Sequence, residues 1–566
     1  MTSAARPIRI LFAFLLATSN LSAQSLYNDR ADAAVQSFLL KFWSGSDQYL
    51  RHQYPSDGQL TGYWTYANGW NSVLDSIERT GRTRYNGWIE GFYIGQNERG
   101  WASDYYDDEC WMCMALIHAY DLASDSKYLS RAETIFTEVQ NAWDTTCCGT
   151  TPGGVWWDRA HSQKATASNA GAAFVAARLY RRTGNAAYLT FARQVYAYWF
   201  AQMVNQFTGQ VCDHITPTGE KVWWKFTYNE GLMIEAALES YEATGEAAFL
   251  TNAHKFATFM VSNEVASTAY GNVLSDGSSA SCTGDCSQFK APAYRALMRL
   301  FAKDRTRTAY ANVLRASEEG IWNLARNADL NIFTTSWAGP PESIIEMPEQ
   351  DSAVAALSRF AQQNETNTFS LTNRFEAEEA IVHHIPLEAL YDGFSGWAYL
   401  AGWNQNGQSV DFRVNLPAPG TYTLSFRYSA GAGNAVRALL VNGAVAVTSL
   451  TFNNTGAWSS YNSATVTRSF TKVGENVITL AFDSTRNSAN YLNLDFLQIA
   501  NDTPPGPGAL NAKLVRPHIV LSWTGPGFLQ SATAANGPWS DVIGHPASPA
   551  TLLMPATDTR YFRVRD

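Results

Sequence analysis

The sequence predicts a multidomain protein in which an all-α domain of paired helices is followed by a β-sandwich and a small all-β domain. Two observations predict the all-α part: a phrase that recurs every 60 or 61 residues, and helical periodicity on both sides of each copy. A third predicts the β part, because after about residue 370 short alternating segments are separated by Gly, Pro and Asn turns.

The recurring phrase marks the turn of a helical hairpin. It reads YDLASDSKYL from Tyr120, YRRTGNAAYL from Tyr180 and YEATGEAAFL from Tyr241, with a looser copy from Phe301. Periodicity predicts helices near residues 31–50, 67–79, 85–94, 108–123, 126–141, 166–182, 186–205, 227–243, 246–263, 287–303, 307–326 and 350–362. Six helix pairs indicate a closed ring, and an open helical solenoid is the alternative.

The remaining chain is predicted to be β structure. The segments SVDFRVNL, TYTLSFRYS, RALLVNG, SATVTRSF and NVITLAFD indicate a β-sandwich over residues 373–500. The Pro/Gly-rich stretch NDTPPGPG at 501–508 is typical of a linker. Residues 509–566 resemble a small β domain to which we assign no role.

The N-terminus resembles an export signal. Arg6 and Arg9 precede the apolar run ILFAFLLATSNLSA, which is too short to span a bilayer, so we expect residues 1–23 to be removed near Ala23. The expected product is a soluble protein that is secreted, periplasmic or at the cell surface, and monomeric. A net charge of −9 argues against a nucleic-acid partner and leaves a neutral polymer as the easier ligand.

The seven cysteines lie between residues 110 and 286 and suit an oxidising compartment, with one left unpaired. Cys282 and Cys286 in CTGDC are spaced to close a small loop, and Cys147 and Cys148 are neighbours in a Gly/Thr loop. Neither group has the spacing of zinc ligands. We expect structural disulfides, with a free thiol as the alternative.

The stretch YYDDECWMCMAL places Asp107 and Asp108 side by side at the start of a predicted helix. Helix capping explains one such carboxylate, but Asp104 and Glu109 crowd the same segment. Adjacent Cα atoms are about 3.8 Å apart, so carboxyl groups about 5 Å apart are within reach. That separation favours a retaining glycosidase over an inverting one, and mutual repulsion would separate the two pKa values.

Together with GGVWWD at 153–158, SNAGAAFVAARLYRRTGNAAYL at 168–189 and YNEGLMIEAALESYEATGEAAFL at 228–250, this stretch resembles glycoside hydrolase family 76. These are (α/α)6-barrel endo-α-1,6-mannanases, and the resemblance covers residues 28–362 of an expected barrel domain over 24–365. It implies that Asp107 is the nucleophile and Asp108 the acid/base, with no cofactor for catalysis.

Further residues are expected at the barrel mouth. Four polar side chains are candidates to bind sugar hydroxyls, with helix capping as the alternative: Asp158, Asn169, Asn229 and Glu230. Three aromatic side chains are candidates to stack on sugar rings, with core packing as the alternative: Trp64, Trp157 and Trp224.

The segments RFEAEEA, SGWAYLAGWNQNGQSVDFRVNLPAPGTYTLSFRYS, TGAWSSY and NYLNLDFLQI resemble carbohydrate-binding modules of families 6 and 35. The resemblance implies a structural Ca²⁺ site formed by Glu376, Glu378 and Asp495, which suits a cation that prefers oxygen ligands. It also implies a sugar-binding site formed by Tyr399, Trp458 and Asn493.

The resemblances imply an exported retaining enzyme that hydrolyses the α-1,6 bonds of mannan backbones. One alternative is another (α/α)6-barrel carbohydrate-active enzyme, such as an unsaturated glucuronyl hydrolase. The other is a glycan-binding scaffold without catalysis, against which the intact Asp pair argues.

Overall fold

The computed structural model describes residues 20–150, 152–276, 284–364, 373–416, 418–486 and 490–501, together with six strands after residue 510. The chain divides into two compact units. Gln24–Asn367 with Pro386–Leu390 forms a helical unit, and Thr368–Ile385 with Tyr391–Asp566 belongs to a β unit.

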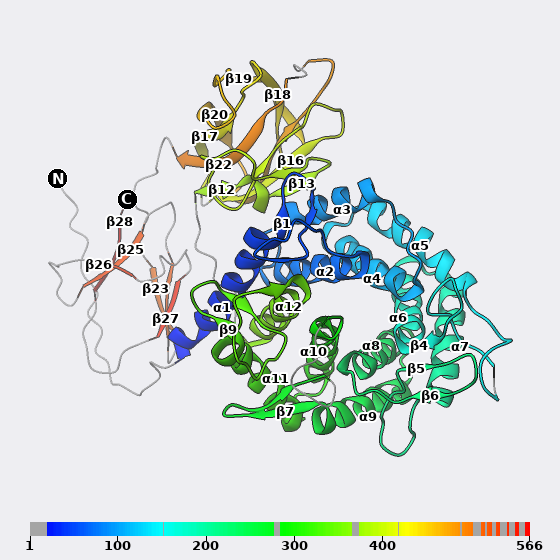
Figure 1. The fold of residues 1–566 in the computed structure, drawn as a ribbon. Coiled ribbons are helices and arrows are strands. Elements are labelled where there is room, and N and C mark those ends of the chain that lie inside the picture. Colours follow the sequence, from blue (N-terminus) through cyan, green and yellow to red (C-terminus); the bar gives the residue numbers. More distant parts are fainter. Residues whose placement is uncertain are drawn as a thin grey trace, which may run out of the picture. The chain divides into compact units, whose positions relative to one another are not determined.

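The helical unit consists of two concentric rings of helices (Figure 1). The inner ring contains α2 (Tyr63–Arg79), α4 (Tyr106–Ala123), α6 (Thr166–Thr183), α8 (Thr227–Thr244), α10 (Cys286–Lys303) and α12 (Met347–Asn364). The outer ring contains α1 (Asn20–Phe42), α3 (Gly87–Arg99), α5 (Ser126–Asn141), α7 (Ala186–Met203), α9 (Ala247–Asn263) and α11 (Thr308–Gly320), which runs into the π-helical turn Ile321–Ala325.

The inner ring is closed, because α12 packs against α2. The hydroxyls of Ser76 and Ser358 lie 2.9 Å apart at this seam, and Arg359 NH2 lies 2.6 Å from Asp75 Oδ1. The prediction of an (α/α)6 barrel is therefore confirmed, and the open solenoid is excluded.

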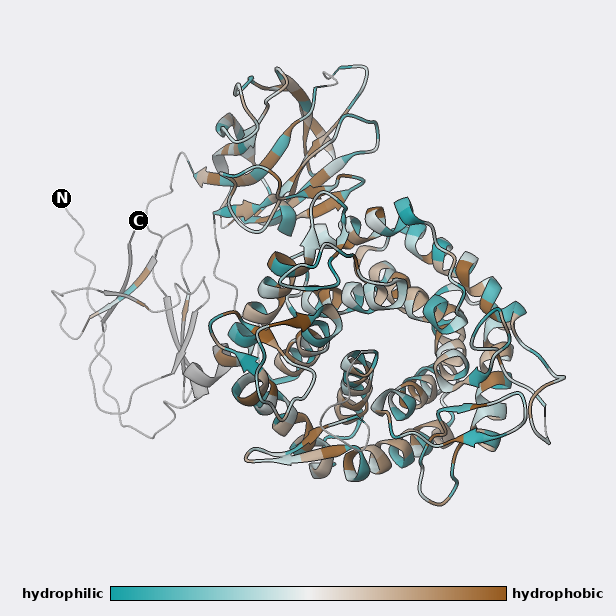
Figure 2. Ribbon diagram, in the orientation of Figure 1, coloured by the Kyte–Doolittle hydropathy of each residue, from teal (hydrophilic) through white to brown (hydrophobic). Residues whose placement is uncertain are grey.

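The core lies between the two rings. Trp70, Trp88, Trp199 and Trp337 are almost fully buried. Figure 2 shows hydrophobic and hydrophilic residues mixed along the outer helices, and in α5 and α11 they form the two faces of an amphipathic helix. Small residues let the inner helices approach closely. A Cβ atom on Gly231 of α8 would come within 2.7 Å of Ala293 Cα on α10.

The predicted helix boundaries differ from the structure by a few residues, except in the first helix. It was expected over 31–50, but α1 ends at Phe42 and the antiparallel strands β1 (Trp43–Ser44) and β2 (Tyr49–Leu50) follow. The sequence GSDQ between them explains the difference, because Asp47 accepts hydrogen bonds from two serines and Gln48 adopts a positive φ of 50°.

Short strands shape the loops of the helical unit: β3 (Gln53–Tyr54), β4 (Lys164–Ala165), β5 (His214–Ile215), β6 (Lys221–Val222), β7 (Val265–Thr268), β8 (Gly271–Leu274), β9 (Arg326–Asn327), β10 (Ile332–Phe333) and β11 (Ile345–Glu346). Strands β4, β5 and β6 form one sheet that joins the loops before α6 and α8.

The β unit contains the predicted sandwich. Its elements are β12 (Arg374–Glu376), a 3₁₀ turn at Ala377–Glu379, β13 (Ile381–His383), β15 (Tyr399–Leu400), β16 (Ser409–Leu416), β17 (Gly420–Ser429), β18 (Ala435–Val441), β19 (Ala444–Phe452), β20 (Asn462–Phe470), β21 (Gly474–Ala481) and β22 (Asn493–Asn501). Strand β14 (Leu387–Glu388) falls in the segment that belongs to the helical unit. One sheet has the order β15-β22-β17-β20 with β12 also on β22, and the other has the order β13-β16-β21-β18-β19. All five segments predicted as strands are strands.

Two three-stranded sheets follow, consistent with the predicted small β domain. Their strands are β23 (Asn511–Val515), β24 (His518–Ser522), β25 (Phe528–Ala532), β26 (Ser540–Asp541), β27 (Ala550–Leu553) and β28 (Tyr561–Arg565). The predicted linker from residue 502 onward and most of the predicted signal peptide lie outside the described residues. Among the described helices, none is long and apolar enough to cross a bilayer.

The cysteines partly follow expectation. Cys147 and Cys148 form a disulfide, and Cys286 is also disulfide-bonded. Cys110, Cys113 and Cys212 are free and buried, so more than one thiol is unpaired. Cys282 lies outside the described residues.

Candidate active site

Asp107 and Asp108 lie in the first turn of α4, where the helix dipole favours negative charge. Neither residue is the N-cap. That position belongs to Tyr105, whose backbone is extended and whose side chain makes no capping hydrogen bond. Capping therefore does not account for the pair, and both carboxyl groups project from the mouth end of an inner helix as half-buried side chains.

The two carboxyl groups have different hydrogen-bond donors. The indole Nε1–H of Trp157 donates to Asp107 Oδ2 at 2.9 Å, and the hydroxyl of Ser103 donates to Asp108 Oδ2 at 2.8 Å. Asp107 Oδ1 is buried and has no hydrogen-bond partner within the described residues. Because an indole N–H can only donate whereas a hydroxyl can donate or accept, the two neighbours are chemically distinct.

The loop between α5 and α6 presents Trp157 to the pair. It is fixed to the start of α4 by a backbone hydrogen bond of 2.8 Å from Tyr106 N to Trp157 O and by a β-bridge between Tyr105 and Asp158. The buried ammonium group of Lys164 stabilises the same loop. It donates hydrogen bonds to the carbonyl of Gly153 at 2.8 Å and to Asp144 Oδ2 at 2.9 Å.

Burial raises the pKa of Asp107 well above its ordinary range, and repulsion from Asp108 adds to the effect. Burial likewise raises the pKa of Asp108 to about 7, with a further contribution from Asp285 at the start of α10. Both carboxyl groups therefore resist ionisation near neutral pH, and the charge on one raises the pKa of the other.

The four polar candidates for sugar binding have structural roles instead, which corrects that expectation. Asp158 accepts hydrogen bonds from the N–H and hydroxyl of Ser162. Asn169 is fully buried and bonds to the backbone of Val155. Asn229 and Glu230 are also buried; the first donates to Asp213, and the second accepts from Val211 N at 2.7 Å.

The three aromatic candidates retain accessible surface. Trp224 is 54% exposed, and Trp64 and Trp157 are half-buried. Trp64 and Trp224 are the two ends of a chain of ring contacts, with centroid distances of 6.5 Å from Trp64 to Phe289, 5.1 Å from Phe289 to Phe226 and 5.7 Å from Phe226 to Trp224. This chain provides an apolar surface across the entrances to α2, α10 and α8.

Sequence reasoning did not identify Ser103, Asp285, Phe226 or Phe289. Ser103 precedes the Asp pair by four residues, and Phe226 and Phe289 lie at the starts of inner helices. Their positions at or just before the starts of inner helices could have identified them, because the loops that enter the inner helices form the mouth of the barrel.

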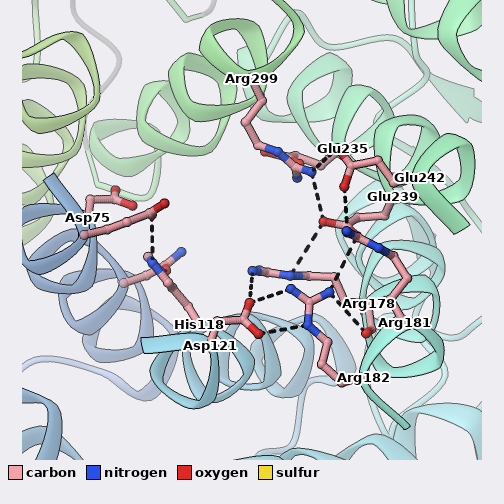
Figure 3. Close-up of polar contacts among 12 residues, drawn as sticks. Asp75, His118, Asp121, Arg178, Arg181, Arg182, Glu235, Glu239, Glu242 and Arg299 are labelled. Carbon is pink, nitrogen blue, oxygen red and sulfur yellow. Dashed lines mark hydrogen bonds and ion pairs between the residues drawn. The ribbon is translucent and has the colours of Figure 1, made fainter. Parts of the chain in front are cut away.

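The opposite end of the barrel holds a separate charged cavity of about 410 Å³. Trp111 and Met114, one and two turns along α4 from Asp107, line its apolar side. Glu239 is the centre of an ion-pair network there (Figure 3), with Arg181 NH1 at 2.5 Å and Arg299 NH2 at 3.0 Å. Burial opposes ionisation of Glu239, but Arg299 and its neighbours outweigh it and lower the pKa to about 2.

Asp75, Glu78 and His118 at this end have the residue types of a metal site. A cation already occupies the position between the two carboxylates, because Arg359 lies 2.6 Å from both Asp75 Oδ1 and Glu78 Oε2. Arg295 Nε pairs with the other Asp75 oxygen at 2.5 Å. The arrangement is that of a structural ion-pair cluster at the α2–α12 seam.

In the β-sandwich the three expected Ca²⁺ ligands converge on one loop. Ser395 bonds to Glu376 Oε2 and Asp495 Oδ1, and the N–H of Trp397 donates to Glu378 Oε1 at 2.7 Å. Glu378 is fully buried, and its Oε2 has no hydrogen-bond partner within the described residues. Burial raises the pKa of both Glu376 and Glu378.

The three residues expected to bind sugar in the β-sandwich differ in their exposure to solvent. Tyr399 is fully buried, so its ring has no face open to a sugar, which corrects that expectation. Asn493 is 4% exposed. Trp458 is half-buried and stacks with Tyr391 at a centroid distance of 6.3 Å, so these two rings are the more accessible aromatic pair.

A barrel with paired acids and aromatic residues at one mouth, followed by a β-sandwich with an aromatic pair, is the organisation of a glycoside hydrolase with a carbohydrate-binding module. Comparison with known families agrees with this class. The chain belongs to glycosyl hydrolase family 76, whose sequence model matches residues 27–372, and the model of carbohydrate binding module family 35 matches residues 373–501.

Several solved structures and curated proteins are similar to parts of the chain. The GH76A α-1,6-mannanase of Salegentibacter sp. HEL1_6 aligns with a TM-score of 0.54 and 23% identity, covering 59% of this chain and 98% of that one. Mannan endo-1,6-alpha-mannosidase DCW1 of Saccharomyces cerevisiae is 26% identical over 44% of this chain and 60% of its own length. An isomaltosyltransferase of Sporosarcina globispora is 34% identical over 22% of this chain and 11% of its own length. The chain thus spans 60% or less of each of these curated relatives.

Proposed function

We propose that the protein is a retaining endo-α-1,6-mannanase in which Asp107 is the nucleophile and Asp108 the acid/base. The observation that carries the proposal is the pair of distinct donors at adjacent carboxyl groups. A mannanase of the same fold supports it, because a variant of that enzyme with two adjacent aspartates replaced by alanine is described as inactive and in complex with an α-1,6-mannotetraose.

The two hydrogen-bond donors support this assignment of roles. A nucleophile must be ionised when it attacks. Burial and Asp108 raise the pKa of Asp107, and the Trp157 N–H, which can only donate a hydrogen bond, opposes that shift by favouring the ionised carboxylate. An acid/base group alternates between protonated and ionised forms. The Ser103 hydroxyl can follow that alternation, since it accepts from a protonated Asp108 and donates to an ionised one.

The reaction proceeds as a double displacement. Asp107 attacks the anomeric carbon while the glycosidic oxygen leaves with the proton of Asp108, which gives a covalent mannosyl–Asp107 ester of inverted configuration. Asp108, now ionised, takes a proton from water. That water attacks the same carbon, releases Asp107 and restores the original α configuration. The aromatic chain from Trp64 to Trp224 offers stacking surface for neighbouring sugars of the backbone.

The test uses linear α-1,6-mannan and an aryl α-1,6-mannobioside with a good leaving group. The parent should release mannose oligomers, and Asp107→Ala should lose activity on both substrates. Asp108→Ala should lose activity on mannan but keep formation of the covalent ester on the aryl substrate, because that leaving group needs little proton donation. Activity of Asp107→Ala on the aryl substrate would reverse the assignment, and an inactive parent would refute the proposed function.

We infer that the β-sandwich binds a polysaccharide and holds Ca²⁺ through Glu376, Glu378 and Asp495. The unpaired Glu378 oxygen and the carboxyl groups around the Ser395–Trp397 loop are of the type that a hard cation prefers. Such a cation would compete with Arg427 for Asp495 and with Arg374 for Glu376. Glycine is required at Gly396, because its φ is +67° and a Cβ atom would collide with Glu378 Oε1. The cation would offset the carboxylate repulsion, and the module would hold the barrel near its polymer.

We infer that the protein is exported and acts on extracellular mannan. The apolar N-terminal run and the Cys147–Cys148 disulfide support this inference. N-terminal sequencing of protein recovered from the culture medium or periplasm tests it, with a start near Gln24 expected. Recovery only in the cytoplasm with residue 1 intact would contradict it.

A further inference from the structure

The loop that presents Trp157 also carries Arg159, which contacts the segment leading into α4. Arg159 Nε donates to the carbonyl oxygen of Ser103 at 2.8 Å, and its backbone N–H donates to the carbonyl of Asp104 at 2.9 Å. Its NH2 donates to Glu109 Oε1 at 2.6 Å. One forked guanidinium therefore ties together the two ends of the segment that contains the catalytic pair.

Glu109 completes the arrangement. Its side chain is 1% exposed, and Oε1 also accepts the backbone N–H of Ser103 at 3.4 Å. Ser103 is thus held at its carbonyl by Arg159 and at its N–H by Glu109. With the backbone fixed on both sides, the hydroxyl is directed at Asp108 Oδ2.

We propose that Arg159 and Glu109 form a positioning unit that fixes Ser103 against Asp108 and thereby sets the proton affinity of the acid/base group. This inference rests on the proposed function and deepens it, because it names residues that control the same site. Arg159 and Glu109 act through Ser103 and are positioning residues.

Other titratable groups interact electrostatically with Asp108 from the surrounding elements: Asp107 and Cys110 on α4, Asp285 at the start of α10, Tyr63 on α2, and Tyr49 on β2. Burial raises the pKa of both tyrosines, so they stay neutral at working pH. Asp107 and Asp285 disfavour ionisation of Asp108. Within the described residues Ser103 is the donor that favours it, so movement of Ser103 should raise the pKa of Asp108.

The test compares pH profiles of kcat/KM on α-1,6-mannan oligomers, whose alkaline limb reports the acid group of the free enzyme. Ser103→Ala should move that limb upward by about one pH unit, the size expected for a hydrogen bond to a charged group. Arg159→Lys keeps the positive charge but cannot donate to the Ser103 carbonyl and Glu109 at the same time. It should therefore move the alkaline limb in the same direction by a smaller amount. Ser103→Thr keeps the hydroxyl and should resemble the parent.

The double variant Ser103→Ala/Arg159→Lys should show the limb of Ser103→Ala alone, because Arg159 acts through Ser103. Arg193→Lys, which alters an exposed ion pair with Glu246, is the matched control and should leave the profile unchanged. Additive shifts, or an Arg159→Lys variant that is slower at every pH with the limb unmoved, would overturn the inference while the proposed function stands. A parent that does not cleave mannan would instead refute the proposed function, and the inference with it.

Discussion

Replacing Asp108 with Asn should stabilise the protein at alkaline pH and not at acidic pH. The folded environment raises the pKa of Asp108 from an ordinary 3.8 to about 7, chiefly by burial. Well below pH 3.8 the carboxyl is protonated in both the folded and unfolded chains, so replacement by Asn changes the free energy of unfolding little. As the pH rises toward 7 the unfolded carboxyl ionises freely and the folded one resists, so the parent progressively loses stability.

The size of the effect follows from the shift. About three pKa units at about 1.4 kcal/mol each give an upper bound of about 4 kcal/mol in the free energy of unfolding at pH 8.5. Equilibrium urea unfolding followed by Trp fluorescence measures the difference, and at pH 4.5, where the unfolded carboxyl is already mostly ionised, the expected effect falls to about 1 kcal/mol. Asp104→Asn, an exposed neighbour, should change the free energy by less than about 0.5 kcal/mol at both values. An Asp108→Asn effect that is the same at both pH values would refute the raised pKa.

Three further predictions concern the rest of the chain. Glu239→Gln should destabilise the barrel by about 3–5 kcal/mol in urea unfolding, because several arginines lose their common buried partner; Glu246→Gln at an exposed ion pair should cost under about 1 kcal/mol, and equal effects would contradict the burial argument. Trp157→Phe keeps the ring but removes the N–H to Asp107, so kcat/KM should fall by about tenfold and the acidic limb of its pH profile should move upward; an unchanged limb would contradict this. Adding Ca²⁺ to EDTA-treated protein should raise the midpoint of the β-sandwich transition in calorimetry, whereas Glu378→Gln should abolish the rise; a rise that persists in the variant would place the ion elsewhere.

Local periodicity was sufficient to predict the barrel, because each helix carries its own apolar pattern and each hairpin turn repeats. The number of helix pairs indicated closure, but the periodicity did not distinguish a closed ring from an open solenoid. Closure depends on contacts between α2 and α12, such as Ser76 with Ser358, that are far apart in sequence. The end of α1 was missed because the turn at Asp47 and Gln48 outweighs the apolar residues around it.

In the candidate site, too, the features that depend on local sequence could be predicted and those that depend on tertiary contacts could not. Two adjacent aspartates in an aromatic segment were conspicuous in the sequence, and the structure places both at the mouth of the barrel. The polar candidates Asn169 and Glu230 carry suitable groups, but tertiary contacts direct these groups into the protein. Ser103 and Arg159 could not be identified in advance, because their importance lies in hydrogen bonds between segments more than 50 residues apart.

The anomeric configuration of the first product tests the central claim most directly. Proton NMR during early hydrolysis of a linear α-1,6-mannan oligosaccharide distinguishes newly formed α and β reducing ends before they equilibrate. The account predicts that the α form appears first, because two displacements at the same carbon restore the original configuration. Initial release of the β form would contradict double displacement through the neighbouring Asp107 and Asp108.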